Sequence, residues 1–155
     1  MNLITLAEDF AQIEYLKNDP FHQWHHIGAV QRRADEICSK LTDKSIDREA
    51  LRLAIIFHDI DYRSYVDHPE ASVKVAQNFL SENGVSAQKI NQIAEIMLDH
   101  SSPHRKIRGD AKTIEDKIIF DADKSIFITT PETYNKYFPL LYLPETRELV
   151  DYRPV

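Results

Sequence analysis

The feature that most constrains this chain is the stretch AIIFHDIDY at residues 54–62, in which a run of apolar side chains ends on an adjacent histidine and aspartate, His58 and Asp59. The apolar run predicts a buried helix. The pair at its end brings an imidazole nitrogen and a carboxylate oxygen within reach of one divalent cation. A single His-Asp pair occurs by chance in many proteins, so the interpretation depends on further histidines and aspartates elsewhere in the chain.

The composition predicts one all-α domain. The chain has 155 residues, of which 43% are hydrophobic and 28% charged, values typical of a globular protein that buries a real core. Only three glycines are present, too few for a turn-rich β-sandwich, and no segment reads as a convincing strand. We expect one domain over residues 1–155, with a core over about 20–128 and a C-terminal segment, 129–155, that wraps the surface.

Charge and targeting signals restrict the partners. The net charge of -6 argues against binding a nucleic-acid polymer, because phosphate contacts dominate that affinity. It leaves room for a small anionic substrate, which needs only a local cationic patch. No apolar run reaches the roughly 20 residues that span a bilayer. The N-terminus lacks a signal-peptide pattern, and the single cysteine, Cys38, cannot form an internal disulfide. We therefore expect a cytoplasmic protein without a membrane partner.

Helical periodicity accounts for most of the chain. Apolar residues recur at spacings of three and four in segments at about 2–17, 22–41, 48–58, 68–82, 87–99 and 113–128. Asp47 and Ser86 are expected to cap helices, Asp67 and Glu70 to form a capping box, and Gly84 to end a helix. Residues 62–67 and 101–110 are expected to be loops. A short helix is expected from Thr130-Pro131, followed by an irregular tail from residue 138.

Helical wheels select the histidines that point inward. His26 lies at the edge of the apolar stripe of its helix, whereas His25 lies on the opposite side. His58 and His100 each share a face with apolar residues of their own helices. Three imidazoles from different helices are therefore expected in the interior.

The last helix of the core offers two aspartates. Asp123 and Asp121 both have apolar neighbours on their side of the helix, and the wheel favours Asp123 only modestly. A lone inward histidine is usually a hydrogen-bonded core residue, and a buried carboxylate needs a partner because burying it unpaired costs several kcal/mol. One cation shared by these side chains removes that cost for all of them together.

The order His, His-Asp, Asp on a helical chain resembles the HD-domain superfamily of metal-dependent phosphohydrolases. The similarity is carried by PFHQWHHIGAV, AIIFHDIDY, EIMLDHSSPH and IIFDADKSIF, and it looks closest to the small bacterial HD proteins described as predicted phosphohydrolases. The resemblance implies a compact helical bundle with a metal ion at its centre. It places the metal ligands at His26, His58, Asp59 and Asp123.

The resemblance also implies a possible second ion. Some members of the superfamily bind two metals through two further histidines, for which His68 and His100 are the candidates here. Close relatives carry a glutamate instead, for which Glu70 is the candidate. We expect one divalent ion, with two as the alternative, chosen from Mn, Fe, Zn, Mg, Co or Ni.

The implied reaction is hydrolysis of a phosphate ester by water that the ion activates. Lys124, next to Asp123, is expected to stabilise charge on the phosphoryl oxygens. Asp61 is a candidate general base, or simply the end of its helix. Candidate substrate-binding residues, each of which could equally be a solvated surface residue, are Arg32, Arg63, His104 and Arg105.

The predicted function is a metal-dependent phosphohydrolase that acts on a small phosphorylated substrate, a nucleotide being one candidate. The first alternative is a diiron oxygenase on the same scaffold, which ligation by His68 and His100 would favour. The second alternative is a module that binds a metal or nucleotide without turnover. The presence of all four core ligands argues against the second alternative.

Overall fold

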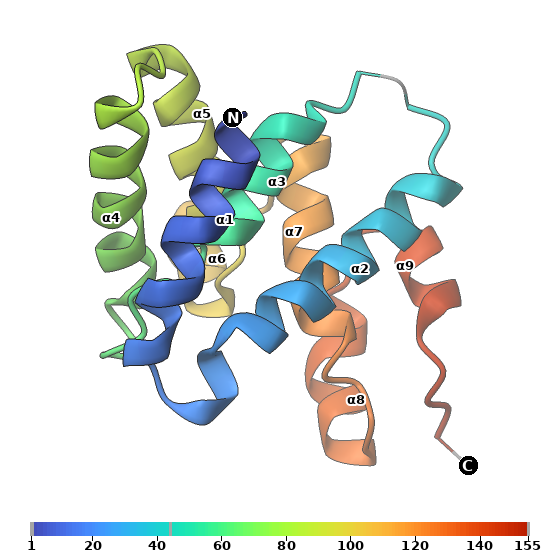
Figure 1. Cartoon of the computed structure of the whole chain (residues 1–155). Coiled ribbons are helices and arrows are strands. Elements are labelled where there is room, and N and C mark those ends of the chain that lie inside the picture. Colours follow the sequence, from blue (N-terminus) through green and yellow to red (C-terminus); the bar gives the residue numbers. More distant parts are fainter. Residues whose placement is uncertain (1, 44, 155) are drawn as a thin grey trace.

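The structure is a computed structural model that describes residues 2–43 and 45–154, and those residues form an all-α bundle without strands (Figure 1). The predicted fold class is therefore confirmed. The helices are α1 (Leu3–Glu14), α2 (Trp24–Lys40), α3 (Arg48–Phe57), α4 (His68–Glu82), α5 (Ala87–Leu98), α6 (Ser102–Arg108), α7 (Ile114–Ser125), α8 (Pro131–Tyr137) and α9 (Pro144–Leu149). Short 3-10 turns lie at Tyr15–Lys17, Pro20–His22 and Phe138–Leu140.

The bundle is built around α3 and α7. Helix α3 packs against α1, α2, α4, α5 and α7, and its apolar residues are almost completely buried. Helix α2 crosses α7 on one side of the molecule, and α4 pairs with α5 on the other (Figure 1). The end of α3 therefore lies where several helices meet, which places His58 and Asp59 in the interior.

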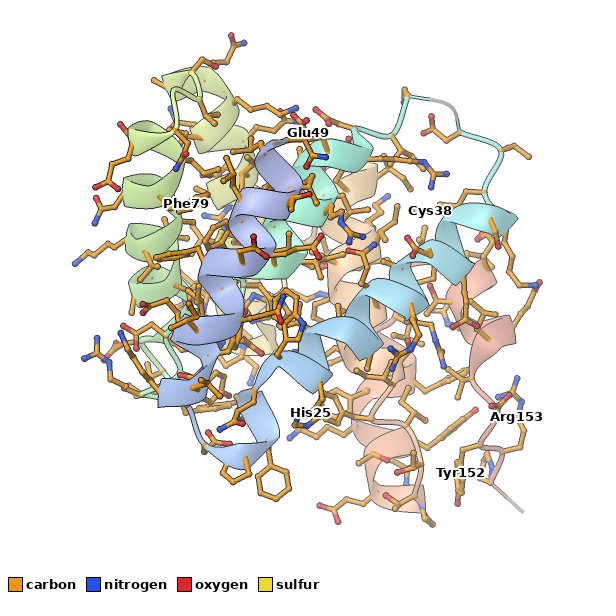
Figure 2. All side chains as sticks on the ribbon, viewed as in Figure 1. His25, Cys38, Glu49, Phe79, Tyr152 and Arg153 are labelled. Carbon is orange, nitrogen blue, oxygen red and sulfur yellow. The ribbon has the colours of Figure 1, made fainter. Side chains whose placement is uncertain are left out.

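Aromatic packing fixes the helices that surround α3. Phe79 extends from α4 toward α1 (Figure 2), and its ring stacks on Phe10 with a centroid distance of 4.8 Å. The Phe57 ring, at the end of α3, lies 5.5 Å from the same Phe79 ring. Pairs of aromatic rings at such distances add to the area they bury, so this contact holds the last turn of α3 against two neighbouring helices.

The helix ends follow the predicted capping residues in most places. Asp47 accepts a hydrogen bond from the backbone N–H of Ala50, and Ser86 accepts one from Lys89. Gly84 ends α4 with a φ of 77°, a conformation that glycine adopts without strain. The caps at Asp47 and Ser86 and the stop at Gly84 are confirmed.

Three local predictions are wrong. Asp67 precedes α4, but its carboxylate accepts from the Ser64 hydroxyl and makes no hydrogen bond to the helix, and Glu70 contacts His104 on α6 instead of closing a capping box. Residues 101–110 are not a loop: α6 occupies most of this segment, with proline in its first turn and Gly109 (φ 85°) at its end. The tail beyond residue 138 contains α9. Both α6 and α9 have a proline in the first turn, where it suits a helix start. The polar composition of residues 101–110 and the proline- and tyrosine-rich composition of the tail had indicated irregular structure instead.

The C-terminal segment is anchored by Asp121. This fully buried carboxylate accepts hydrogen bonds from the backbone N–H groups of Tyr142 and Leu143, at 2.8 and 2.9 Å, and from the Thr146 hydroxyl at 2.6 Å. Burial raises the pKa of Asp121, against the effect of these donors. The second aspartate of α7 thus attaches the tail to the core.

Of the predictions about the membrane and the domain, only the first is tested, and only in part. No helix in the described part of the chain is both long and apolar enough to cross a membrane. The main apolar core draws on α1 to α5 and α7 and includes Leu143, and a smaller cluster groups Ile128, Leu141 and Val150 in the C-terminal segment. The single domain over residues 1–155, whose end residues lie outside the described part, stays a prediction.

Replacing Asp121 by alanine is expected to destabilise the protein by about 2–4 kcal/mol, because it leaves two buried backbone N–H groups without acceptors. Urea unfolding measures the change in the free energy of unfolding. Asp9, an exposed residue of α1, provides the control, and Asp9→Ala should stay within about 0.5 kcal/mol of the wild type. An equal effect of the two substitutions would contradict the anchoring role of Asp121.

The ionised carboxylate of Asp116 is expected to lower the free energy of unfolding at neutral pH. Burial and the neighbouring Asp99 carboxylate raise the pKa of Asp116 to about 6 from 3.8, so the folded state binds this proton more tightly than the unfolded state. The wild type should therefore lose about 1 kcal/mol, after allowance for solvent screening, as the pH rises from 4 to above 6. Asp116→Asn keeps an acceptor for the Thr113 N–H and should not show this loss.

Urea titrations of both proteins at pH 4 and pH 7.5 measure the difference. The variant should match the wild type at the lower pH and exceed it at the higher one. If the free energy of unfolding changed with pH in the same way in the two proteins, the surroundings of Asp116 would not raise the pKa of its carboxyl group.

Candidate metal centre

Four side chains from three helical regions converge in the interior. His26 projects from α2, Asp123 from α7, and His58 and Asp59 lie directly after α3; all four are buried. The Nε2 atom of His26 lies 3.1 Å from Asp123 Oδ1 and 3.3 Å from Asp59 Oδ2. The Nε2 atom of His58 lies 3.3 Å from Asp59 Oδ2 and 3.5 Å from Asp123 Oδ1. These residues form the first cluster.

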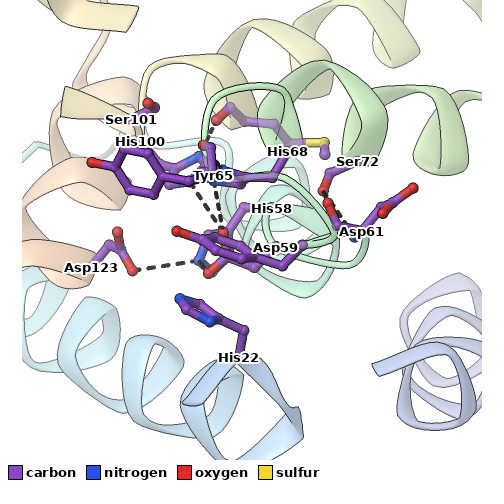
Figure 3. A network of polar contacts seen from close by, with 12 residues as sticks. His22, His58, Asp59, Asp61, Tyr65, His68, Ser72, His100, Ser101 and Asp123 are labelled. Atoms are coloured by element: carbon purple, nitrogen blue, oxygen red, sulfur yellow. Dashed lines mark hydrogen bonds and ion pairs between the residues drawn. The ribbon is translucent and has the colours of Figure 1, made fainter. Parts of the chain in front are cut away.

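Two further histidines meet the same aspartate from the other side (Figure 3). The Nε2 atoms of His68 and His100 lie 3.2 and 3.3 Å from Asp59 Oδ1, and 3.1 Å from each other. His68 begins α4, and His100 follows α5. Asp59, His68 and His100 form the second cluster, so the two oxygens of Asp59 each face a different pair of imidazoles.

Backbone carbonyls set the orientation of the histidine rings. The Nδ1 atom of His58 lies 2.7 Å from the carbonyl oxygen of Ile55, and Nδ1 of His68 lies 2.7 Å from that of Tyr65. Nδ1 of His100 contacts the carbonyl oxygen of Met97 in the same way. A carbonyl accepts, so Nδ1 must carry the proton and donate. In the neutral ring Nε2 is then left as a lone pair that faces the clusters.

The donor set fits a divalent cation. Lone pairs of imidazole nitrogens face carboxylate oxygens, which only accept, and the Nε2 atoms of His68 and His100 face each other. His58 Nε2 and Asp59 Oδ1 are buried without a hydrogen-bond partner. Ligands about 2.0–2.2 Å from one ion stand roughly 3.0–3.4 Å apart. The observed separations of 3.1–3.5 Å within the first cluster match that spacing.

The electrostatics of the first cluster favour positive charge. Burial alone lowers the pKa of His58, but Asp59 and Asp123 raise it to about 10. The same carboxylates raise the pKa of His26 to about 9. Burial disfavours the charged form of both aspartates, yet the surrounding cationic groups hold their pKa values well below the usual range. The two ionised carboxylates are thus buried beside imidazoles whose charged form they favour, and a metal cation held by the neutral rings would balance the same negative charge.

The clusters form the floor of a cleft of about 380 Å³. Lys124 lines its wall and donates to Asp123 Oδ2 at 2.6 Å, while Oδ1 of the same carboxylate faces the imidazoles. Burial lowers the pKa of Lys124, but Asp123 more than offsets this effect, so the ammonium stays charged. The cleft therefore offers a cation beside the ligand cluster.

The predicted general base does not line this cleft. Figure 3 shows Asp61 directed away from Asp123, with its backbone N–H bonded to Ser72 Oγ at 3.1 Å. The Asp61 carboxylate is held by Arg63 through two hydrogen bonds, of 2.7 and 2.5 Å. This pairing lowers the pKa of Asp61, which makes the group a weaker base. Arg63 is itself mostly exposed.

The other predicted substrate-binding residues also lie outside the cleft lining. Arg32 is exposed on α2. Arg105 donates to the Leu140 carbonyl at 2.6 Å and lies 4.0 Å from the Tyr142 ring centroid, so it holds the C-terminal segment. His104 is buried between Ser101 and Glu70 and joins α6 to α4. Direct contacts of these residues with substrate stay predictions.

Sequence reasoning missed the residues that hold the His-Asp pair in place. The buried hydroxyl of Tyr15 donates to the Ile56 carbonyl at 2.7 Å and accepts from the Asp59 N–H at 3.3 Å. The Asn18 side chain donates to the Asp59 carbonyl at 2.8 Å and accepts from the Tyr62 N–H at 3.1 Å. Both residues lie more than 40 positions before the pair, so no local pattern links them to it.

Several cleft-lining residues were also not foreseen. His22 lies one turn before His26 on the same side, a signal that the sequence does contain, and its ring stacks on Tyr62 with a centroid distance of 3.5 Å. Phe127, Lys136 and Tyr137 lie beyond the last predicted ligand and carry no recognisable pattern.

Comparison with known proteins agrees with this geometry. The sequence profile of the HD domain matches residues 24–126, which is more than half of the chain and includes both clusters. No curated protein sequence matches the chain significantly.

Two solved structures share the fold. One, from an uncultured Thermotogales bacterium, is described as a predicted HD superfamily hydrolase; it is 20% identical, with 97% of this chain and 90% of that chain covered and a TM-score of 0.68. The other is the Lin1889 protein of Listeria innocua, 21% identical, with 96% and 87% covered and a TM-score of 0.64. On the strength of the profile match, this chain belongs to the HD domain family.

Proposed function

We propose that this protein is a metal-dependent phosphohydrolase that cleaves a phosphate ester of a small molecule, with nucleotides among the candidates. The single observation that carries the proposal is the buried carboxylate of Asp59, shared by two sets of imidazoles at the floor of a cleft. The description of the related Thermotogales protein as a predicted hydrolase agrees with it.

The two clusters define the proposed ligands. His26, His58, Asp59 and Asp123 would hold one divalent ion, and Asp59, His68 and His100 would hold a second one. Sites with two metal ions recur in enzymes that transfer phosphoryl groups, where the ions would stabilise the attacking and the leaving oxygen. The imidazole and carboxylate donors suit Mn, Fe, Co, Ni or Zn, and Mg is the least suited because it prefers oxygen ligands.

When bound, such an ion polarises a phosphoryl oxygen and lowers the pKa of a water molecule. The reaction consumes one water: a bond forms between its oxygen and phosphorus as the ester bond breaks, and an alcohol and inorganic phosphate are released. The Lys124 ammonium stabilises the negative charge that develops on the phosphoryl oxygens. Asp123 holds that ammonium at the cleft wall through its Oδ2 atom.

One alternative receives support from the second cluster. A diiron oxygenase on the same scaffold also needs His68 and His100 as ligands, and both point at Asp59. Anaerobic purification followed by metal analysis, and then assays with a panel of phosphate esters and with oxygen, distinguishes the two functions. Phosphate release without oxygen uptake selects the hydrolase. Two bound irons with oxygen consumption select the oxygenase, and neither activity selects a binding module.

Replacing Asp59 by alanine is expected to abolish turnover and to reduce bound metal at least tenfold, because both clusters lose a ligand. Asp61 provides a matched control two residues away, since its carboxylate pairs with Arg63. Asp61→Ala should keep the metal content of the wild type. Metal content by mass spectrometry and circular dichroism of both variants make the comparison, and full metal retention in Asp59→Ala would refute the ligand assignment.

Replacing Lys124 by methionine should lower kcat by about 10²–10³ fold while metal content stays unchanged, because the ammonium acts on charge that develops in the transition state. Lys124→Arg restores the charge and should recover part of the rate. Lys117, two turns earlier on α7 and absent from the cleft lining, is the control position. A drop in kcat of the same size in Lys117→Met would show that helix stability, and not charge, is the cause.

A further inference from the structure

The outer wall of the cleft comes from a part of the chain beyond the HD domain match. The match ends at residue 126, and α8 follows α7 at the lower end of the bundle (Figure 1). The cleft-lining residues of this segment are Phe127, Thr129, Thr133, Lys136 and Tyr137. The first and second clusters thus lie within the HD domain, whereas this wall belongs to the segment that follows the domain.

The cleft lining carries two lysines in different surroundings. Lys124 is nearly buried and pairs with Asp123 beside the first cluster. Lys136 is exposed on α8 and has no carboxylate within ion-pair distance among residues 2–43 and 45–154. Its Nζ atom lies 5.1 Å from the centroid of the Tyr137 ring. Within the described residues, therefore, the Lys136 ammonium lines the cleft without a paired carboxylate, in a chain of net charge -6.

The remaining charges of the cleft lining do not compete for Lys136. The only carboxylates that line the cleft within the described residues are Asp59 and Asp123. Asp59 faces imidazoles through both oxygens, and Asp123 divides its two oxygens between the imidazoles and Lys124. An anion that enters the cleft thus meets Lys124 beside the first cluster and Lys136 on α8.

Lys136 stands on a helix that is fixed before any ligand arrives. Thr130 and Thr133 close a capping box at the start of α8, with bonds of 3.1 and 3.2 Å. The chain after α8 is held by Arg105 at the Leu140 carbonyl and by Asp121 at Tyr142 and Leu143. Because the helix is already in place, binding of an anion has to order only the Lys136 side chain and not the backbone that carries it.

We infer that the substrate is a phosphate monoester whose alcohol part carries a second anionic group, a carboxylate or a phosphate, and that Lys136 binds this group. The inference rests on the proposed function, because it assigns the phosphoryl group to the metal clusters and Lys124. Tyr137 lines the cleft together with both lysines, and its ring lies 5.1 Å from the Lys136 Nζ atom. The body of the ester would pass along this ring from one cation to the other.

Binding of phosphonates tests the inference independently of turnover, because the carbon–phosphorus bond is not a substrate for ester hydrolysis. The probes are propylphosphonate, 3-phosphonopropionate and propane-1,3-bisphosphonate, with shorter and longer homologues, added to the manganese-loaded protein in a calorimeter. We expect one chain length in each of the two series with a second anionic group, or in one of them, to bind about tenfold more tightly than the alkylphosphonate of the same length. Separate carboxylate and bisphosphonate arms identify the second group.

The variant Lys136→Met should remove this preference and leave propylphosphonate binding unchanged. Lys106, an exposed lysine on α6 that does not line the cleft, is the matched control, and Lys106→Met should keep the preference. Equal binding of charged and neutral tails by the wild type, or a preference that survives in Lys136→Met, would overturn the inference.

Turnover assays separate this outcome from the proposed function. Hydrolysis of simple phosphate esters without any preference for a second anion would uphold the hydrolase and reject the role of Lys136. A preference that depends on Lys136 in a protein that hydrolyses no phosphate ester would reject the hydrolase and uphold the recognition of two anionic groups.

Discussion

The structure depends on one buried carboxylate, that of Asp59. An ionised aspartate with four imidazoles around it is unfavourable in an apolar interior unless a cation compensates the charge that converges there. The fold supplies the conditions for this arrangement: α3 brings Asp59 to the point where five helices meet, and Tyr15 and Asn18 fix its backbone by hydrogen bonds. The apolar run of α3 holds the helix rigidly in the core, and the His-Asp pair at its end supplies the candidate metal ligands.

The two aspartates of α7 are also buried carboxylates whose charge is compensated. Asp121 and Asp123 lie two positions apart and therefore point in different directions from one helix. Asp123 turns toward the imidazoles and Lys124, whereas Asp121 receives two backbone N–H groups and a hydroxyl from the C-terminal segment. Asp121 is thus compensated by hydrogen-bond donors, and Asp123 by the imidazoles and the Lys124 ammonium. Helix α7 therefore joins the candidate metal centre to the segment that forms the cleft wall.

The parts of the fold that the sequence made predictable are those with a periodic signal. The inward faces of His26, His58 and His100 followed from helical wheels, and His25 lies at the surface as expected (Figure 2). Contacts between distant residues left no such signal. The Asp61 carboxylate accepts hydrogen bonds from Arg63, and Glu70 contacts His104 instead of capping the start of its own helix, α4. The polar composition of α6 predicted a loop, although the segment forms a helix of under two turns.

The position of the cleft wall explains why the substrate is harder to infer than the metal. Ligands for an ion must meet at fixed distances of about 2 Å, so the residues that hold it are tied to the rigid helices of the HD domain. A substrate tail needs only a charge or a ring in roughly the right place, and α8 supplies Lys136 and Tyr137 from outside the matched region. Selectivity of this kind can change without disturbing the clusters. On the proposed function, the chemistry of the centre would be set by residues on or next to α2, α3, α4, α5 and α7, and the choice of molecule by the separately anchored α8.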